Sequence, residues 1–246
     1  MKDKLSIYLC GFRKGMSSQN CLLLLIEKWR KCVDNNGKAG VLLTDLSKAF
    51  DCLVHDLLIA KLHAYGFDYQ AIKLLYNYLS GRLQRVRVNA SFSSWREIFS
   101  GVPQGSILGP PLFNIYSSDL FFFILLEIVN YADDNSPFSC ASTIPRVITT
   151  LESEAHNLLN WLKNNMEKAN PSKFHLLLSD SDQAYSVKID NFNIFNSKSE
   201  KLLGITIDNK LTFDEHVSKL CTKASQKLHA LSRVGNYMTQ PKGRSL

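Results

Sequence analysis

The chain has 246 residues, of which 45% are hydrophobic and 21% are charged. A chain of this length forms one large domain or two small ones, and its ordinary globular composition excludes intrinsic disorder. Its formal net charge of +7 favours a polyanionic partner but does not identify one.

Helical and extended patterns follow one another irregularly along the first part of the chain. Apolar periodicity predicts three helices, at residues 21–33, 55–65 and 68–79. A short apolar run at 39–46, with an acid near its end, predicts a buried strand. Residues 82–89 alternate arginine with valine, which predicts a strand that pairs with 95–99 as a hairpin.

The second part of the chain begins with a loop rich in glycine and proline at 101–111. A strand at 127–131 is followed by the tight turn 133–135 and a returning strand at 137–140. Further elements are expected at 144–168 (helix), at 174–178, 185–189 and 201–207 (strands), and at 213–231 (helix). Because strands and helices do not alternate regularly, the predicted fold class is α+β, with an antiparallel sheet flanked by helices.

The six cysteines are dispersed, and none forms a C-x-x-C pair or lies near a histidine at zinc spacing. Scattered thiols of this kind are typical of a reducing compartment. The apolar runs 5–10 and 120–126 are far shorter than the roughly 20 residues of a membrane span, and no cleavage site follows the first. We therefore expect an intracellular protein, nuclear or cytoplasmic, without a signal peptide, a transmembrane segment or a membrane partner.

Three aspartates are candidate metal ligands. Asp45 ends the predicted buried strand, and Asp133 and Asp134 occupy the predicted turn. Phosphoryl transfer from a nucleoside triphosphate uses two Mg²⁺ ions about 3.5–4 Å apart, held by hard oxygen ligands. Carboxylates on a rigid sheet would hold such ions if the strand end and the turn met. Taken alone, however, an Asp-Asp turn is usually only a solvated turn.

Six short segments follow one another in a characteristic order and spacing. They are GFRK at 11–14, LTDLSKAFD at 43–51, GVPQGSILGP at 101–110, YADD at 131–134, NPSK at 170–173 and KLLGITID at 201–208. In this register they resemble the late fingers segment, motifs A, B, C and D, and the next conserved block of the reverse transcriptases of non-LTR (LINE-type, jockey-like) retrotransposons. One segment would be a weak indication, whereas six in order make a chance resemblance negligible.

The resemblance implies a fold and a reaction. The fold would be a polymerase palm, with partial fingers at 1–40, the palm with motifs A to E at 41–208, and a basic helix at 209–246 that starts a thumb. The reaction would be RNA-directed DNA polymerisation, with an RNA template, a DNA primer and deoxynucleoside triphosphates. The early fingers, an endonuclease domain and the rest of the thumb would be missing, so we expect a truncated copy with little or no activity of its own.

The resemblance also assigns roles to the acids. Asp45 and Asp133 would hold both Mg²⁺ ions, or Mn²⁺ in their place, with the carbonyl oxygen of Leu46 as a further ligand. Asp134 would be the third catalytic carboxylate, nearer the primer end. Phe50 would place its ring under the sugar, where it would clash with a 2′-hydroxyl and select deoxynucleotides; without the motif it would be a core phenylalanine.

Four further residues are implied in nucleotide binding. Gln104, Gly105 and Ser106 would lie against the incoming nucleotide and the template, where glycine lets the backbone approach closely. Lys173 would lie near the triphosphate as a proton donor to pyrophosphate. An exposed lysine at a helix end is an equally good interpretation of Lys173.

Basic side chains gather near the C-terminus. Lys219, Lys223 and Lys227 are four residues apart and share one face of the predicted helix, next to a face of apolar side chains. The apolar face is expected to pack on the palm while the lysines contact phosphates of the primer–template, unless they are simply a solvated basic face. Arg85 and its neighbouring arginines in the predicted hairpin form a second candidate phosphate contact.

Three alternatives are compatible with parts of this pattern. The chain could be a catalytically inactive, nucleic-acid-binding remnant, which primer extension beside a binding assay would distinguish. A viral RNA-dependent RNA polymerase shares a similar palm but is disfavoured by Phe50 and by the YADD sequence. A reverse transcriptase of the group II intron kind is disfavoured by the asparagines that flank YADD and by the final basic helix.

Overall fold

The fold is built around a six-stranded sheet. The computed structural model describes residues 6, 8–44, 46 and 49–235. The strands of the sheet are β1 (Lys38–Leu43), β6 (Glu127–Tyr131), β7 (Asp134–Ala141), β8 (His175–Leu178), β9 (Ser186–Ile189) and β10 (Phe192–Ser197). Their order is β6-β7-β1-β8-β10-β9, and every neighbouring pair except β8–β10 is antiparallel. The predicted α+β fold is therefore confirmed.

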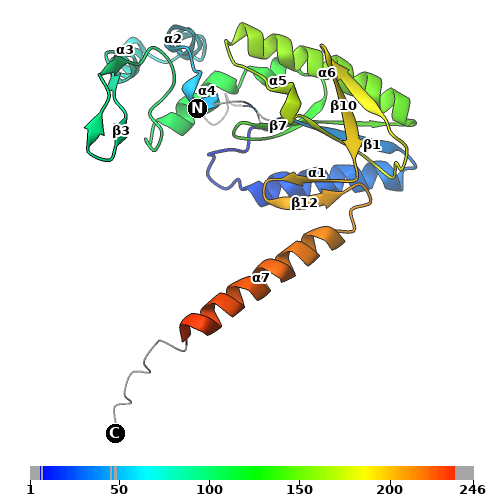
Figure 1. The fold of residues 1–246 in the computed structure, drawn as a ribbon. Coiled ribbons are helices and arrows are strands. Elements are labelled where there is room, and N and C mark those ends of the chain that lie inside the picture. Colours follow the sequence, from blue (N-terminus) through cyan, green and yellow to red (C-terminus); the bar gives the residue numbers. More distant parts are fainter. Residues whose placement is uncertain (1–5, 7, 45, 47–48, 236–246) are drawn as a thin grey trace.

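Two helices cover the two faces of this sheet, as Figure 1 shows. α1 (Ser18–Asp34) packs on one face and α6 (Ile144–Asn164) on the other. Side chains of β1 alternate between the layers, so that Val41 and Leu43 belong to the core under α1 and Leu42 to the core under α6. The central strand is buried on both faces, which explains its continuous apolar run.

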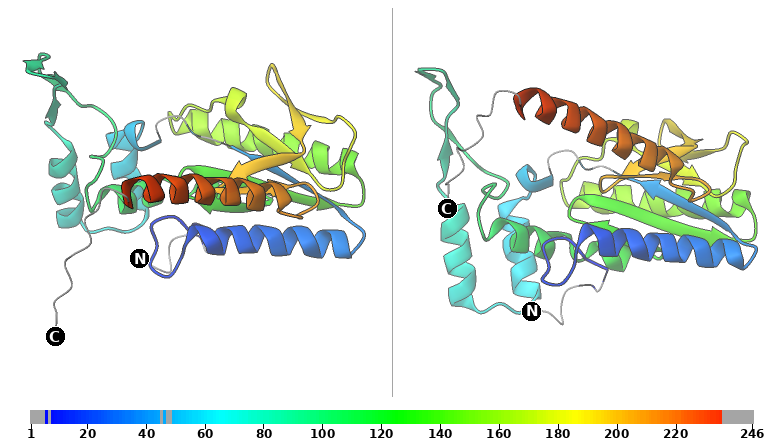
Figure 2. Two further views of the ribbon diagram at one scale, coloured as in Figure 1. Left: turned by 60° about the horizontal axis from the view of Figure 1, so that its bottom comes forward. Right: turned by 90° about the horizontal axis from the view of Figure 1, so that it is seen from below.

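A second group of helices lies beside the sheet (Figure 2). It comprises α2 (His55–Ala64), α3 (Tyr69–Leu79), α4 (Gly109–Ser117) and α5 (Leu120–Phe123), with the 3-10 turn η2 (Ala49–Asp51). Their apolar side chains share one core with α6, in which Phe113, Tyr116 and Trp161 are almost completely buried. This core connects the helical group to the sheet through Ile128 of β6 and the side chains of α6.

A two-stranded ribbon projects from the body between α3 and α4 (Figures 1 and 2). Its two ladders pair β2 (Leu83–Gln84) with β5 (Arg96–Glu97), and β3 (Arg87–Val88) with β4 (Ser91–Phe92). The hairpin predicted from residues 82–99 is therefore confirmed. All residues from 82 to 97 are exposed.

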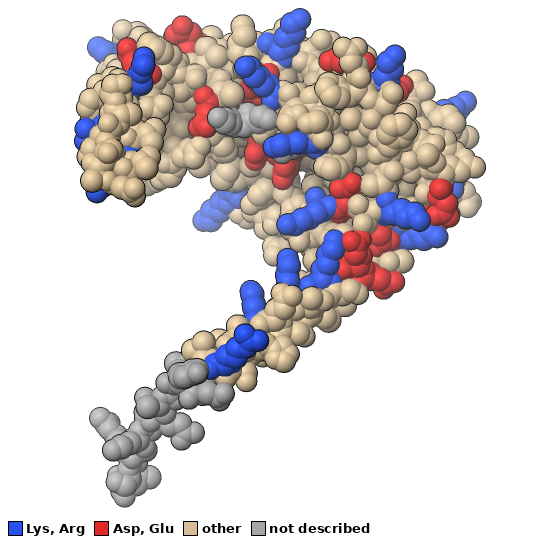
Figure 3. All heavy atoms as spheres, in the orientation of Figure 1, with Lys and Arg blue, Asp and Glu red and all other residues tan. Residues whose placement is uncertain are grey.

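The C-terminal helix leaves the body. A hairpin of β11 (Ser199–Leu202) and β12 (Ile205–Asp208) leads into α7 (Asp214–Gly235), which extends away from the sheet with basic side chains along it (Figures 1 and 3). The expectation that its apolar face packs on the palm is wrong, because Val217, Leu220 and Leu228 are 55%, 52% and 66% exposed. Amphipathic spacing shows that a helix has an apolar face, but it does not show what covers that face.

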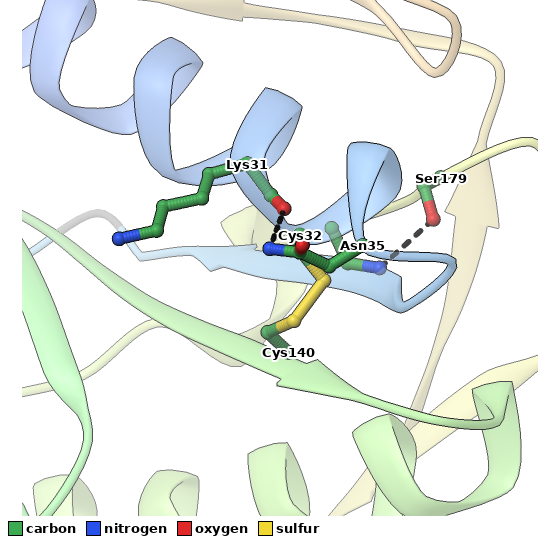
Figure 4. The surroundings of a disulfide bond; sticks show 6 residues. Lys31, Cys32, Asn35, Cys140 and Ser179 are labelled. Atoms are coloured by element: carbon green, nitrogen blue, oxygen red, sulfur yellow. Dashed lines mark hydrogen bonds between the residues drawn. A yellow bond between two sulfur atoms is a disulfide. The ribbon is translucent and has the colours of Figure 1, made fainter.

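A disulfide joins α1 to β7. Cys32, near the end of α1, is bonded to Cys140, which is 108 residues away in the sequence, as Figure 4 shows. The expectation of six scattered thiols is therefore wrong for this pair. The two cysteines meet only because α1 packs along the strand that carries Cys140, and no local spacing in the sequence reveals such a contact.

Most of the predicted elements are present with shifted ends. The predicted helix 144–168 ends at Asn164, and the segment 201–207 forms parts of two strands with a turn between them. β10 was not expected, because its mostly exposed side chains show no clear alternation. α4 begins inside the predicted loop, where Pro110 suits the first turn of a helix. None of the described helices is long and apolar enough to cross a membrane.

Candidate active site

A two-residue turn between β6 and β7 carries the paired acids. Tyr131 pairs with Asp134, which leaves Ala132 and Asp133 as the loop residues. Ala132 has a φ of 57°, in the left-handed region that costs a residue with a Cβ roughly 1–2 kcal/mol. Such strain persists only where the surroundings fix the backbone, and it is concentrated at functional sites. The turn is thus present, one residue earlier than predicted.

Two asparagines that flank the turn hold its backbone. The buried side chain of Asn130 donates to the Ala132 carbonyl (3.0 Å) and to Asn135 Oδ1 (2.9 Å). Asn135, also buried, donates its amide to the Asp133 carbonyl (3.4 Å). Sequence reasoning missed this role, although one signal was present: an asparagine stands on each side of the YADD segment.

The end of β1 lies beside this turn. Thr44 donates its N–H (3.0 Å) and its hydroxyl (2.7 Å) to the carbonyl of Asn135. Leu46 lies opposite Ala169 in an isolated antiparallel bridge. Asp45, the third expected acid, falls outside the described residues, and its carboxylate is not placed. Of the two residues that flank Asp45, Thr44 is thus bonded to the strand that follows the turn, and Leu46 is paired with Ala169.

The N-terminal segment packs tightly against the turn. The N–H of Cys10 donates to the Asn130 carbonyl (3.3 Å), and the carbonyl of Gly11 accepts from the Asn114 side chain (2.8 Å). A Cβ on Gly11 would lie 2.3 Å from the backbone nitrogen of Ala132. This close approach requires glycine, a constraint that the GFRK segment alone does not reveal.

The glycine-rich loop after β5 is tied to the segment that follows β1. The N–H groups of Gly101 and Val102 donate to the carbonyls of Leu53 (2.7 Å) and Phe50 (3.0 Å). Gly101 has a φ of 83°, and a Cβ there would lie 2.9 Å from the Cα of Asp51. Only glycine fits this position, and the contact brings two of the six motif segments together.

The three residues expected to bind nucleotide lie in this loop. Gln104 donates to Asp51 Oδ1 (2.9 Å), and the hydroxyl of Ser106 accepts from the N–H of Gly109 at the start of α4 (3.0 Å). Gly105 is exposed and has a φ of 79°. The structure thus places Gln104 beside η2, with its amide engaged by an aspartate, and Ser106 at the start of α4.

Phe50 is half-buried in a small aromatic cluster. Its ring stacks on Phe113 with a centroid separation of 4.5 Å and meets the ring of Phe12 edge-on at 5.7 Å. Phe50 therefore has a packing role on at least one side of its ring. The residue as a whole keeps some solvent exposure, as a contact with a sugar would require.

A hollow of about 260 Å³ opens beside Asp134. It is lined by Leu43, Thr44, Asp134, Ser136, Lys173, His175, Lys201, Leu202 and Leu203. Lys173 belongs to the 3-10 turn η3 (Pro171–Lys173) and shares this hollow with Lys201. Two cationic side chains next to an aspartate suit a ligand that carries phosphates.

A buried ionic cluster lies behind the site, between α2, α4 and the end of α6. Lys61 donates to Asp119 Oδ1 (2.9 Å), and its Nζ lies 4.4 Å from the centre of the Tyr116 ring. Glu167 is also buried, and neither of its carboxylate oxygens has a hydrogen-bond partner among the described residues. Burial raises the pKa of Glu167 to about 7; Lys61 opposes this shift, while Asp119 and Asp133 add to it.

Glu167 should make the protein less stable as the pH rises. Below pH 4.5 both states are protonated; between 4.5 and about 7 the unfolded state releases its proton while the folded state retains it. Stability therefore falls through this window, by about 3 kcal/mol, and stays lower above it. Glu167→Gln should raise the melting temperature at pH 9 and leave it unchanged at pH 4.5, measured by thermal unfolding.

The control for this experiment is Glu27→Gln, which removes an exposed glutamate from α1. It should change the melting temperature little at either pH. An equal effect of Glu167→Gln at both pH values would show that the Glu167 carboxyl does not titrate differently in the folded and unfolded states.

The expected nucleic-acid contacts lie on exposed surfaces. Lys223 and Lys227 are exposed on α7, whereas Lys219 forms an ion pair with Glu215 (2.6 Å). Arg85 lies on the ribbon, with its guanidinium 4.0 Å from the centre of an aromatic ring. We therefore expect Lys219 to contribute less to phosphate binding than its two neighbours do.

Comparisons with known proteins agree with these features. Residues 3–207 match the family described as reverse transcriptase (RNA-dependent DNA polymerase). The probable RNA-directed DNA polymerase from transposon BS of Drosophila melanogaster is 28% identical over 90% of this chain and 26% of its own length. The RNA-directed DNA polymerase from mobile element jockey of the same organism is 26% identical over 85% of this chain and 24% of its own length. The chain thus spans about a quarter of the length of these relatives.

Solved structures share the fold. A telomerase from Candida tropicalis in complex with a TWJ fragment of telomeric RNA superposes with a TM-score of 0.58 and 13% identity, over 81% of this chain and 33% of that one. The apo telomerase of that species, truncated from its C-terminal domain, gives a TM-score of 0.54 and 14% identity, over 80% of this chain and 38% of that one. At these identities the likeness concerns the fold alone.

Proposed function

Because the chain belongs to the reverse transcriptase (RNA-dependent DNA polymerase) family, we propose that it is the polymerase core of a jockey-like non-LTR retrotransposon. The fold is α+β, of the polymerase palm type. The observation that carries the proposed reaction is the strained turn with Asp133 and Asp134 beside the end of β1. We assign 1–40 to partial fingers, 41–208 to the palm and 209–246 to the start of a thumb.

Two Mg²⁺ ions would be held by Asp45 and Asp133, with the Leu46 carbonyl as a further ligand. The donor set fits, because Mg²⁺ prefers hard carboxylate and carbonyl oxygens and retains places for substrate phosphates. When bound, the ions would stabilise the charge on the attacking and leaving oxygens. Asn130 and Asn135 would orient the acids by fixing the turn backbone, so that little reorganisation is needed when substrate binds.

The remaining site residues would position the nucleotide. Gln104, Gly105 and Ser106 would meet the base and template, and Lys173 would neutralise the triphosphate from the hollow beside Asp134. Gln104, whose amide donates to Asp51 Oδ1, would exchange this hydrogen bond for one to the nucleotide or the template. The exposed Lys223 and Lys227 of α7 would contact phosphates of the primer–template.

The test is single-nucleotide addition by the purified chain to a DNA primer on an RNA template, with enzyme in excess so that slow turnover is detected. We expect slow addition, at the low level expected of a truncated copy, that requires Mg²⁺ and a deoxynucleoside triphosphate complementary to the template. Binding of the primer–template without any addition would instead identify a catalytically inactive nucleic-acid-binding protein.

Phe50→Val should weaken the discrimination between sugars. If the ring blocks the 2′-hydroxyl, a smaller side chain should lower the preference for deoxynucleotides by at least about tenfold, which corresponds to about 1.4 kcal/mol. The measurement is the ratio of addition rates for a deoxynucleotide and the matching ribonucleotide.

The control is Phe12→Ala, which removes a ring that touches Phe50 but is itself 50% exposed. Alanine is chosen because Phe12 has a φ of 56°, where a β-branched valine would strain the backbone. This variant should leave the sugar preference unchanged. If Phe50→Val lowers both rates by the same factor, the role of Phe50 is only to pack against Phe113.

A further inference from the structure

We propose that the ribbon of residues 82–99 is a stacking platform for unpaired nucleotides of the RNA template, ahead of the site of synthesis. This inference rests on the proposed polymerase function. It concerns a surface that none of the catalytic residues occupies.

The ribbon has the composition of a single-strand binding surface. Four arginines are set against one glutamate between residues 82 and 99, and three aromatic residues interleave with them. The aromatic side chains remain accessible: Phe92, Trp95 and Phe99 are 50%, 56% and 76% exposed. Arginines with exposed aromatic rings bind single-stranded nucleic acid through phosphate contacts and base stacking, with little dependence on sequence.

The planar groups of the ribbon are already arranged for stacking. The guanidinium of Arg85 lies 4.0 Å from the centre of the Phe92 ring and 4.5 Å from that of the Trp95 ring. The guanidinium of Arg87 lies 5.4 Å from the Phe92 ring. These contacts hold the arginines extended while they remain exposed, so less side-chain entropy is lost when a nucleotide binds.

The ribbon has no protein partner among the described residues that would explain its exposed apolar side chains. A two-stranded ribbon alone in water is marginally stable, and large exposed apolar side chains mark interaction surfaces. The positive charge of the ribbon favours a polyanionic partner over an apolar one.

A polar hollow leads from the ribbon towards the site. It has a volume of about 840 Å³, and its walls include Arg82, Gln84 and Glu97 from the base of the ribbon and Asp51 and Gln104 from the site. A strand that lay in this hollow would connect the ribbon with the residues proposed to contact the templating base. In a primer–template complex the uncopied template is unpaired whereas the primer is paired, so we assign the platform to the template and not to the primer.

The test is binding of the purified chain to two labelled primer–template duplexes, one blunt and one with a 5′ RNA overhang of about ten nucleotides. We expect the overhang to tighten binding at least about tenfold, the effect of a single stacked base. Trp29 and Trp161 are 2% and 1% exposed, so quenching of tryptophan fluorescence by the overhang reports on Trp95. An overhang of abasic sites should give neither effect.

Variants separate stacking from folding and from the proposed function. The double variant Phe92→Ala, Trp95→Ala should lose the tenfold tighter binding that the overhang gives, and should bind the blunt duplex as before. The double variant Phe92→Tyr, Trp95→Phe keeps two aromatic rings and should retain the tighter binding. Replacing Lys219, Lys223 and Lys227 with Gln should weaken binding of both duplexes equally. The slope of the logarithm of the binding constant against the logarithm of the salt concentration should become less steep by about two units.

Two results would overturn the platform while leaving nucleotide addition and duplex binding intact. The first is an overhang that does not tighten binding. The second is a tightening that persists when both rings are replaced or when the overhang has no bases. Failure of the chain to bind either duplex would overturn the proposed function itself. The two failures are therefore distinguishable.

Discussion

Asp133→Asn is expected to lower the rate of nucleotide addition by at least about a thousandfold, equivalent to about 4 kcal/mol of transition-state stabilisation. The substitution keeps the volume and shape of the side chain but removes the charge that would bind Mg²⁺. The half-buried side chain lies in a turn that is fixed through the Asp133 backbone carbonyl, which the substitution does not alter. The measurement is single-turnover addition at saturating Mg²⁺.

The control for Asp133→Asn is Asp182→Asn, which removes an equal charge from an exposed position between β8 and β9. It should leave the rate unchanged, and both variants should melt within about two degrees of the unmodified protein. Addition by Asp133→Asn at more than a tenth of the normal rate would contradict the assignment of Asp133 as a metal ligand.

Gly11→Ala should slow nucleotide addition by about a hundredfold without touching any substrate. The added Cβ would meet the Ala132 nitrogen at 2.3 Å, and the segment cannot withdraw easily because bonds from Cys10 to Asn130 and from Asn114 to Gly11 hold it in place. The turn must therefore shift, and a displacement of about 1 Å near reacting groups can cost about 10²-fold in rate. The rate is measured as for Asp133→Asn, and thermal unfolding should show a loss of about 1–3 kcal/mol from overpacking.

Gly235→Ala is the matched control, since a Cβ at Gly235 meets nothing within 4 Å. It should change neither the rate nor the melting temperature appreciably. If Gly11→Ala destabilises the protein but adds nucleotides at the normal rate, the turn does not depend on the N-terminal segment for its position.

Local patterns in the sequence were sufficient to predict the framework of the site. β6 lies at the residues that the apolar run 127–131 indicates, and the turn and the returning strand follow because Asp and Asn favour tight turns. The exposed ribbon was predicted equally well from alternation alone. In these segments the structure depends on neighbours in the sequence.

Features that depend on distant contacts could not be predicted in this way. Gly11 requires glycine because of Ala132, and Cys32 meets Cys140 only once α1 has packed on the sheet. Glu167 lies within the expected helix 144–168, where a glutamate would ordinarily be exposed, yet α6 ends at Asn164 and the residue is buried in the segment that follows. Each of these depends on a residue more than a hundred positions away or on burial that composition does not reveal.

The central claim is that Asp133 and Asp45, which are 88 positions apart, hold the same metal ions. Fe²⁺ can replace Mg²⁺ at oxygen sites, and with ascorbate and peroxide it generates radicals that cut the backbone next to the bound ion. In the presence of primer–template and a deoxynucleoside triphosphate, we predict two cuts, one close to Asp45 and one close to Asp133, both suppressed by excess Mg²⁺ and both lost in Asp133→Asn. Cutting at only one of the two positions, or cutting that persists in Asp133→Asn, would contradict a shared metal site.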